Sequence, residues 1–194
     1  MFVDASSFDF VARLEAQWTT IRDECLALGP EAFEPWVQRE MYGEGWSVYG
    51  LWAFSKRVES GIEACPKTAG IVSAVPGLTT AGFSRLTAGA HIQPHVGWVR
   101  TVYRMHLGLV VPDGCTLRVG DETRSWREGE ALIFDDTTEH EARNTSDQDR
   151  IVLLLDFLRP GVDPAEVDVA PAEVERMIDR HTGAFPSARK RSRR

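Results

Sequence analysis

Three absences limit what this 194-residue chain can be. It has three cysteines, Cys25, Cys65 and Cys115, which form no CxxC pair and leave an odd count, so neither a disulfide framework nor a thiolate zinc site is expected. No apolar run reaches the roughly 18 residues that a membrane-spanning helix requires. The first ten residues, MFVDASSFDF, carry acids where a signal peptide carries basic residues. We therefore expect a soluble, cytoplasmic protein without a membrane span.

Basic charge is also scarce. The formal net charge is −7, so the body of the chain lacks a positive surface for nucleic acid, and nucleic acid is not expected as a partner. The exception is RKRSRR at 189–194, which we interpret as a solvated basic tail. Apolar residues, in contrast, are plentiful. With 43% hydrophobic and 9% aromatic residues, the chain can form the core of one domain.

The N-terminal region, residues 1–76, has the patterns of helices and one strand. Apolar residues recur at helical spacing over 11–28, which predicts one amphipathic helix. The sequence WSVYGLWAF at 46–54 predicts an aromatic-rich strand. A second helical stretch follows over 56–74 and is broken at Pro66. We expect this region to pack against a larger β structure.

From residue 81 onward the pattern changes to short β-prone runs. They recur every 8 to 15 residues with turn-forming stretches between them, as in an antiparallel sandwich or barrel. The runs are AGFSRL, RTVYRMHLGLVV, CTLRV, TRSW, ALIFD, HEARN and RIVLLLDFL. We predict a mainly β fold with a helical buttress, a double-stranded β-helix of the jelly-roll, cupin-like type. A single domain is expected overall, with 77–160 as the β-helix core, a C-terminal helix in 161–188 and the tail at 189–194.

Two of the five histidines stand where a jelly roll can present them to one metal ion. His95 lies in HIQPHVG (91–97), a segment between strands whose proline and glycine favour a rigid turn, and His140 starts a later strand about half a barrel away. Neutral imidazole is the commonest protein ligand for metal ions. The alternative is that both are ordinary surface or core histidines. His91, in the same segment, is interpreted as structural.

Two arginines are predicted to point into the barrel. In the run 100–111, alternation places Val102, Arg104 and His106 on one face, and Arg150 opens the last strand with the following apolar residues facing the other way. A buried arginine is costly unless a carboxylate pairs with its planar guanidinium. Because no partner acids are obvious, the two arginines suggest a dicarboxylate ligand. The alternative is that they face solvent or pair with Glu or Asp across the sheet.

Several stretches together resemble one protein family, the aspartyl/asparaginyl β-hydroxylases, which are iron(II)- and 2-oxoglutarate-dependent oxygenases. The resemblance runs from about Gly77 to Pro160 and follows the family's order and spacing. The stretches are FS (83–84), HIQPHVG (91–97), RMHLGLV (104–110), WREG (126–129), FDD (134–136), EHE (139–141), Arg150 and Asp156.

The resemblance assigns roles to residues. His95 and His140 would bind the iron. The residues that would hold 2-oxoglutarate are Ser84, Arg104, His106 and Arg150, with Ser84 and Arg150 at its distal carboxylate. Most related oxygenases add an Asp or Glu two residues after the first histidine. Here that residue is Gly97, as in the family, which leaves a two-histidine site. Asp135 and Asp136 would either orient His140 or form an ordinary turn.

The activity that the resemblance implies is hydroxylation of a C–H bond by an Fe(II)/2-oxoglutarate-dependent dioxygenase. Its substrate would be a small molecule, amino acid or peptide, of aspartyl, asparaginyl or related type. Val102 stands where aspartyl-hydroxylating relatives have a second arginine, so aspartate is expected to be a poor substrate. Two other functions stay open: a non-catalytic cupin-like domain that binds a small molecule, and a metal-dependent isomerase or lyase that performs no oxidation.

Overall fold

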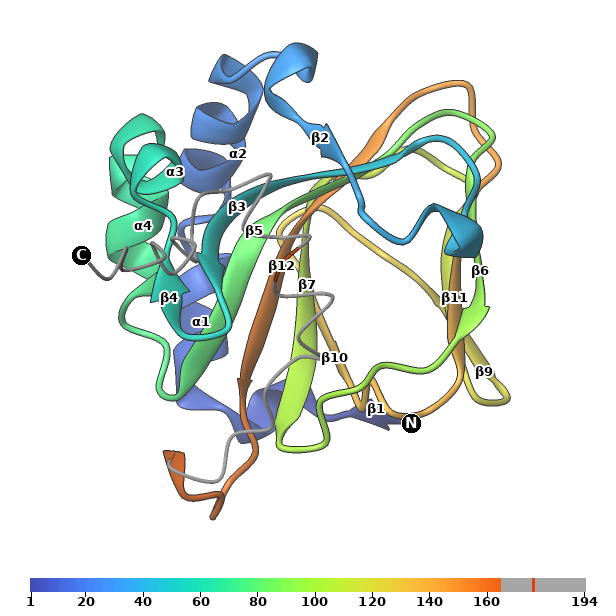
Figure 1. Ribbon diagram of the computed structural model, residues 1–194. Helices are drawn as coiled ribbons and strands as arrows, with labels where there is room; N and C mark the ends of the chain where they lie inside the picture. The colour runs from blue at the N-terminus through green and yellow to red at the C-terminus, as the bar shows by residue number, and fades with distance from the viewer. Residues whose placement is uncertain (165–175, 177–194) are drawn as a thin grey trace, which may run out of the picture.

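The computed structural model describes residues 1–164 and residue 176. Within this part of the chain, two antiparallel β-sheets face one another (Figure 1). The eight-stranded sheet has the order β1-β10-β7-β12-β5-β3-β2, with β4 paired to β3, and the four-stranded sheet has the order β6-β11-β8-β9.

The elements have the following bounds. The strands of the large sheet are β1 (Phe2–Val3), β2 (Glu34–Pro35), β3 (Trp46–Ala53), β4 (Lys56–Arg57), β5 (Leu78–Leu86), β7 (Val102–Val110), β10 (Ala131–Phe134) and β12 (Arg150–Leu158). The strands of the small sheet are β6 (His91–His95), β8 (Cys115–Val119), β9 (Glu122–Ser125) and β11 (His140–Asn144). The α-helices are α1 (Asp9–Glu15), α2 (Trp18–Ala27), α3 (Glu59–Ala64) and α4 (Pro66–Val72).

Apolar residues form two cores, one on each face of the large sheet. The helices cover its outer face, at the left of Figure 1, where Phe10 and Ile21 pack with Leu107 and Leu153 of the central strands. The second core lies between the two sheets and includes Val152. Because successive side chains of a strand point to opposite faces, Leu153 faces the helices while its neighbour Val152 faces the barrel interior.

The β part of the fold agrees with the sequence predictions. Each run predicted over 81–158 forms a strand, the strand predicted at 46–54 is β3, and the helical stretch broken at Pro66 is α3 followed by α4. Pro66 takes the first position of α4, where its missing N–H leaves no hydrogen bond unmade. The predicted double-stranded β-helix with a helical buttress is confirmed.

Two predictions need correction. The single helix predicted over 11–28 is two helices, α1 and α2, because the backbone leaves the helical conformation at Gln17 (φ −113°, ψ 10°). At the end of α1, the Glu15 side chain accepts a 2.9 Å hydrogen bond from the N–H of Ala131 in β10, which ties this helix end to the large sheet. The segment 91–95, predicted as a turn, is strand β6. The N-terminal region packs on the large sheet as predicted and in addition contributes four of its strands, β1, β2, β3 and β4.

Most of the predicted helix at 161–188 and all of the basic tail at 189–194 lie outside the described residues. Within the described part of the chain, no helix has the length and apolar character needed to cross a membrane.

Candidate active site

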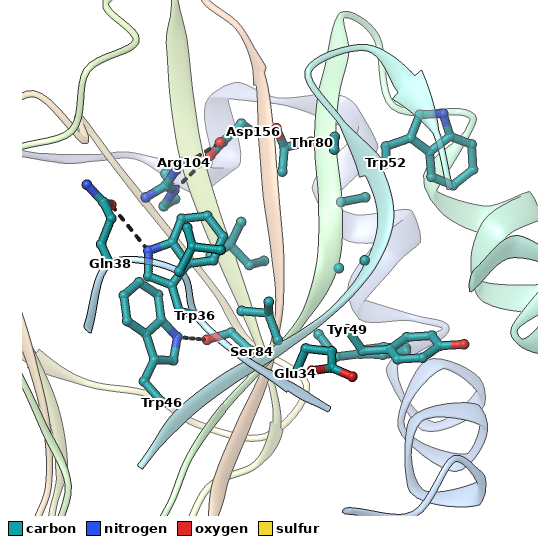
Figure 2. A pocket seen from close by; sticks show the side chains of 18 of the residues that line it. Glu34, Trp36, Gln38, Trp46, Tyr49, Trp52, Thr80, Ser84, Arg104 and Asp156 are labelled. Atoms are coloured by element: carbon teal, nitrogen blue, oxygen red, sulfur yellow. Dashed lines mark hydrogen bonds and ion pairs between the residues drawn. The ribbon is translucent and has the colours of Figure 1, made fainter. Parts of the chain in front are cut away.

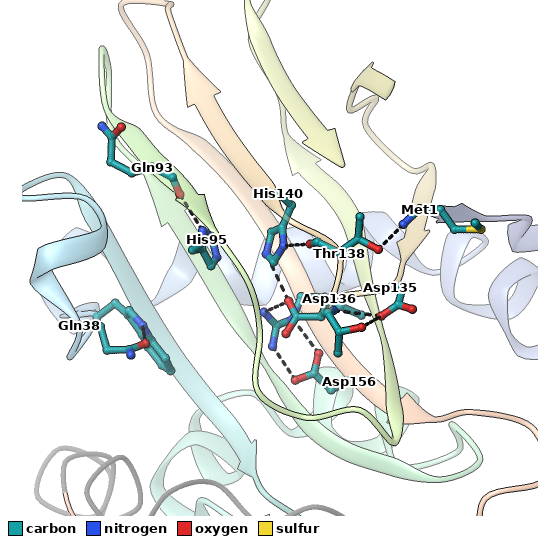
Figure 3. Close-up of polar contacts among 12 residues, drawn as sticks. Met1, Gln38, Gln93, His95, Asp135, Asp136, Thr138, His140 and Asp156 are labelled. Carbon is teal, nitrogen blue, oxygen red and sulfur yellow. Dashed lines mark hydrogen bonds and ion pairs between the residues drawn. The ribbon is translucent and has the colours of Figure 1, made fainter. Parts of the chain in front are cut away.

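The two predicted metal ligands lie side by side on neighbouring strands of the small sheet. His95 ends β6 and His140 begins β11, and the two residues are Cα partners in the antiparallel pairing of these strands. Their ring centroids lie 4.1 Å apart with 55° between the ring planes, and Figure 3 shows both side chains on the same side of the sheet. Strand pairing therefore brings together two histidines that are 45 positions apart in the sequence.

Both imidazoles are held in the same way by the backbone. The Nδ1 atom of His95 lies 2.7 Å from the carbonyl oxygen of Gln93, and that of His140 lies 2.8 Å from the carbonyl oxygen of Thr138. A carbonyl only accepts, so Nδ1 carries the hydrogen and Nε2 keeps its lone pair. Burial lowers the pKa of His95, and burial together with the His95 ring lowers that of His140 to about 3. Both rings are therefore neutral near pH 7, as a metal ligand must be.

Gly97 leaves room for a carboxylate from another loop. A Cβ atom at Gly97 would lie 1.5 Å from Oδ2 of Asp136, while the Gly97 N–H donates a 2.8 Å hydrogen bond to the Asp136 carbonyl. Oδ1 of Asp136 lies 3.3 Å from Nε2 of His140. The described residues contain no group of three or more His, Cys, Asp or Glu side chains arranged to hold a metal ion. A metal ion here would accordingly depend on the two imidazoles for its protein ligands.

Arg104 differs from its prediction as an arginine without partner acids. Its Nε and Nη2 donate to the two oxygens of Asp156 at 2.8 and 2.9 Å, and its Nη1 donates to Asp136 at 2.6 Å. Burial would lower the pKa of Arg104, but the carboxylates of Asp136 and Asp156 outweigh it and raise that pKa. Arg104 thus matches the alternative that was left open, pairing with acids across the sheet. Two of its five N–H groups remain for other contacts.

Arg150 points into the barrel, as its place in the strand pattern predicted, and no carboxylate among the described residues pairs with it. The residue is 1% exposed, and its Nε and Nη1 atoms have no hydrogen-bond partner among the described residues. Burial lowers its guanidinium pKa to about 10. The guanidinium carbon lies 4.5 Å from the centre of the Trp126 ring, a cation–π contact that satisfies none of its N–H donors.

Two more buried polar side chains near Arg150 are also unpaired. Among the described residues, neither ring nitrogen of His106 has a hydrogen-bond partner, and the indole N–H of Trp126 has none either. Their ring centroids lie 5.9 Å apart. Burial, assisted by Arg150, keeps the His106 pKa well below its usual value, so the ring is neutral. Unpaired buried polar groups are rare and costly, so three of them together indicate a site for a polar ligand of negative charge.

Trp126 was missed by the sequence predictions, and Gly108 explains how it enters the barrel. A Cβ at Gly108 would lie 2.1 Å from the carbonyl oxygen of Arg127, so the segment after Trp126 can cross β7 closely at this glycine. The Gly108 and Gly129 N–H groups bond to the carbonyls of Glu130 and Gly108 at 3.1 and 2.9 Å. The sequence offered one signal for this contact: Gly108 inside a strand and Gly129 in a turn, since a glycine within a strand often marks a close approach of another backbone segment.

Ser84 lies on the same inward face as Arg150. It is the Cα partner of Val152, two residues along β12 from Arg150, and it is 3% exposed. Its Oγ accepts a 3.1 Å hydrogen bond from the indole N–H of Trp46 (Figure 2), which leaves its own O–H available to donate. The structure therefore gathers Ser84, His106 and Arg150 on the inward faces of β5, β7 and β12.

A cavity of about 470 Å³ opens beside the histidine pair. It is lined by His95, Gly97, Asp136, Arg104 and Ser84, and then by aromatic residues of β3 and the loops before it. This volume lies in the range of small-molecule sites. The remaining predicted site residues, His140, His106 and Arg150, are buried behind this lining.

The other candidate residues have structural partners. His91 contacts Glu141 through Nε2 at 2.6 Å and Gln93 through Nδ1 at 2.9 Å, so both of its ring nitrogens are engaged. Asp135 pairs with Arg159 and is separate from the histidines, which divides the predicted acidic pair: Asp136 alone reaches His140.

Comparison with known proteins gives a consistent result. A family model described as aspartyl/asparaginyl beta-hydroxylase matches residues 15–160. Over 123 residues the chain is 46% identical to the ornithine lipid ester-linked acyl 2-hydroxylase of Rhizobium tropici, covering 62% of this chain and 44% of that protein. It is 35% identical over 173 residues to the human aspartyl/asparaginyl beta-hydroxylase, covering 84% of this chain and 23% of that protein. The chain thus spans less than half the length of either relative.

Among solved structures, a Pseudomonas putida prolyl-4-hydroxylase aligns with a TM-score of 0.52 over 76% of this chain and 88% of that chain. The sequence identity is 17%, so this likeness concerns the double-stranded β-helix fold alone.

Proposed function

Because this chain belongs to the aspartyl/asparaginyl β-hydroxylase family, we propose that it is an iron(II)- and 2-oxoglutarate-dependent hydroxylase. The observation that carries the proposal is the pair of neutral imidazoles, His95 and His140, whose Nδ1 atoms donate to backbone carbonyls and so leave the Nε2 lone pairs for a metal ion; His95 also lines the cavity. The buried, unpaired group around Arg150 in the same barrel supports it, as do the names of the two curated relatives, both hydroxylases.

The residues present fit iron(II) and 2-oxoglutarate. His95 and His140 would hold iron(II), which accepts imidazole nitrogen as a ligand. Arg150 and Ser84 would bind the distal carboxylate of 2-oxoglutarate, and the same anion would supply the hydrogen-bond partners that Arg150 lacks. His106 would contribute a ring N–H from β7.

Arg104 would act both on the neighbouring carboxylates and on 2-oxoglutarate. Three of its N–H groups fix Asp136 and Asp156, so it holds the Asp136 carboxylate in the space left by Gly97. Its remaining N–H groups can meet the other carboxylate of 2-oxoglutarate. The pairing keeps a buried charge compensated before the co-substrate enters.

The bound iron, with dioxygen and 2-oxoglutarate, would supply the oxidation: one substrate C–H becomes C–OH while 2-oxoglutarate becomes succinate and CO2. The chain itself orients the imidazoles through backbone carbonyls, compensates the carboxylates and keeps bulk water from a site where His140 is 4% exposed.

Anaerobic loading with iron(II) and 2-oxoglutarate tests this function. A weak visible charge-transfer band should develop in the wild type and be absent in His95→Ala and His140→Ala. His91→Ala is the matched control and should keep the band, because His91 is engaged by Glu141 and Gln93. Loss of iron from the His91 variant, with iron retained by the His95 variant, would make the ligand assignment wrong.

Succinate formation from 2-oxoglutarate, scored with a panel of amino acids, peptides and acyl compounds, then separates the enzyme from its alternatives. A non-catalytic cupin-like domain would bind 2-oxoglutarate without releasing succinate. A metal-dependent isomerase or lyase would consume its substrate without 2-oxoglutarate.

A further inference from the structure

A neighbouring indole sets the polarity of the Ser84 hydroxyl group. The indole N–H of Trp46 donates a buried 3.1 Å hydrogen bond to Oγ of Ser84, as Figure 2 shows. A serine hydroxyl has one hydrogen to donate and two lone pairs that accept, whereas an indole N–H can only donate. The bond therefore occupies a lone pair of Ser84, and the hydroxyl hydrogen has to point elsewhere. Ser84 is 3% exposed, and no group among the described residues accepts this hydrogen.

The register of three strands places Trp46, Ser84 and Arg150 close together. Leu86 of β5 is the Cα partner of both Trp46 in β3 and Arg150 in β12. Ser84 lies two residues before Leu86 on β5, so its side chain points to the same face of the sheet. Diagonal neighbours on paired strands are within reach of long and aromatic side chains. Trp46 and Arg150 therefore flank Ser84 from the two strands that pair with β5.

The ring of Trp46 is held in place by other aromatic residues. It is 8% exposed and packs against Trp36 and Tyr42, whose ring centroids lie 5.3 and 5.4 Å from its own. The Tyr42 hydroxyl donates a 2.6 Å hydrogen bond to the carbonyl of Trp36, and the backbone N–H of Trp36 donates to the carbonyl of Trp46 at 3.1 Å. These contacts restrain the indole on the side away from Ser84, so the fold fixes the direction of its N–H.

With Ser84 oriented in this way, the unpaired polar groups around Arg150 present hydrogens to a ligand. Nε and Nη1 of Arg150 and the indole N–H of Trp126 have no hydrogen-bond partner among the described residues. The hydroxyl of Ser84 adds one more donor to this set. A carboxylate accepts hydrogen bonds and donates none, so it suits such a set, whereas an alcohol or a primary amide would bring donors of its own.

From these contacts we infer that Trp46 is a positioning residue for the co-substrate: its N–H fixes Ser84 as a hydrogen-bond donor to the distal carboxylate of 2-oxoglutarate. Trp46 acts through Ser84 and needs no contact of its own with the ligand. Without the indole N–H, the hydroxyl would be free to rotate, and its favourable orientation would have to be restored on binding. The inference rests on the proposed hydroxylase function and deepens it by assigning a role to Trp46.

A double-mutant cycle on 2-oxoglutarate binding tests this role. The full chain is loaded with Mn(II), and calorimetry gives the Kd of 2-oxoglutarate for the wild type, Trp46→Phe, Ser84→Ala and the double variant. Phenylalanine keeps an aromatic ring in the cluster but has no N–H. We expect Ser84→Ala to raise Kd about tenfold, because a hydrogen bond to a charged group is lost, and Trp46→Phe to raise it about threefold.

The background in which Trp46 is replaced decides between the two roles that it can have. In the Ser84→Ala background the indole has no hydroxyl to orient, so adding Trp46→Phe should change Kd by less than about twofold. A residue that acts by packing alone would have the same effect in both backgrounds. An equal effect of Trp46→Phe with serine and with alanine at position 84 would therefore overturn the inference.

Trp18→Phe is the matched control for the loss of an indole. Trp18 begins α2 on the helical face of the large sheet, where its ring lies 4.8 Å from the guanidinium carbon of Arg22, and it does not line the cavity. This variant should bind 2-oxoglutarate as the wild type does. A rise in Kd as large as that of Trp46→Phe would show a general effect of losing a tryptophan and would count against the inference.

The hydrogen bond itself can be followed without metal or co-substrate. In NMR spectra of the ¹⁵N-labelled full chain, the indole N–H resonance that is missing from Trp46→Phe belongs to Trp46. A hydrogen bond to oxygen deshields this proton, so Ser84→Ala should move its resonance upfield. An unchanged resonance in Ser84→Ala would show that the indole N–H does not depend on the hydroxyl, and would also overturn the inference.

The outcomes separate this inference from the proposed function. If the cycle shows coupling but no substrate leads to succinate, the role of Trp46 at an anion site stands and the hydroxylase proposal fails. If succinate is released and the cycle shows no coupling, the hydroxylase stands and the role of Trp46 is wrong. The cycle is repeated with glutarate, which has the same distal carboxylate without the 2-oxo group. Coupling is expected there too, and a chain that binds neither diacid would overturn the inference.

Discussion

Replacing Arg150 by methionine should change the stability of the protein and its response to 2-oxoglutarate in opposite directions. Burial lowers the guanidinium pKa from its usual value to about 10, which corresponds to roughly 3 kcal/mol disfavouring the charged form in the folded state. Both folded and unfolded chains are charged at pH 7, so this cost is present there and is relieved only as the pH rises through 10. The Trp126 face, 4.5 Å away, offsets about 1 to 2 kcal/mol of it.

Methionine at position 150 fills much of the same space without a charge or an unpaired donor. Without ligand, the free energy of unfolding of Arg150→Met should rise by about 1 to 2 kcal/mol, as found when apolar side chains replace poorly compensated buried ions. The melting temperature at pH 7 should then rise by about 4 °C for a chain of this length. At 2-oxoglutarate concentrations a hundredfold above Kd, the wild type should gain about 2.7 kcal/mol, and the variant should gain none.

Differential scanning calorimetry in the presence of Mn(II), with and without 2-oxoglutarate, measures both effects. The matched control is Arg85→Met, since Arg85 is a partly exposed arginine of β5 that pairs with Asp149. The control should be no more stable than wild type and should keep its response to 2-oxoglutarate. The reasoning is refuted if ligand-free Arg150→Met melts below the wild type, or if 2-oxoglutarate stabilises it as much as the control.

The carboxylates around the site supply three further tests. Gly97→Asp should not create a third metal ligand, because its Cβ would displace Asp136 from Arg104; lower thermal stability without tighter metal binding is expected in paired melting and metal titrations. The Arg118 guanidinium holds the pKa of Glu141 at about 2, so the stabilisation is full above about pH 4.5 and is lost as the pH falls toward 2. Glu141→Gln should therefore lower the melting temperature clearly at pH 7 and little at pH 2.5, as circular dichroism can follow. Free aspartate should yield less succinate than a neutral substrate, since Val102 of β7 offers no positive charge to its carboxylate; equal yields would contradict this.

The strands and their facing could be predicted because alternation is a local property of the sequence. The alternation in β12 predicted that Arg150 and Leu153 point to opposite faces of the strand. In the structure, Arg150 is buried on the inner face of the large sheet and Leu153 on its outer face. The same rule placed Arg104 and His106 together on β7. Side-chain period and burial suffice for such predictions.

The partners of these residues could not be predicted in the same way, because they depend on which strands pair and in which register. Asp156 is the Cα partner of Arg104 only through the β7–β12 pairing, and Asp136 reaches it from a loop. Trp126 enters the barrel through a backbone approach at Gly108. A sequence states the types of these residues but not their distances, so the resemblance suggested the members of the site and left their contacts open.

The histidine pair illustrates how the main chain can preorganise the two imidazoles of the proposed metal site. Each imidazole donates its Nδ1 hydrogen to the carbonyl oxygen two residues earlier, His95 to Gln93 and His140 to Thr138. These acceptors belong to the backbone, so no side-chain substitution at the acceptor residues removes them. The tautomer and ring orientation then follow from the conformation of the chain leading into each histidine. With few ligands, most of the affinity for a metal depends on such preorganisation. Side chains around the pair, Asp136 above all, can therefore tune the site without having to create it.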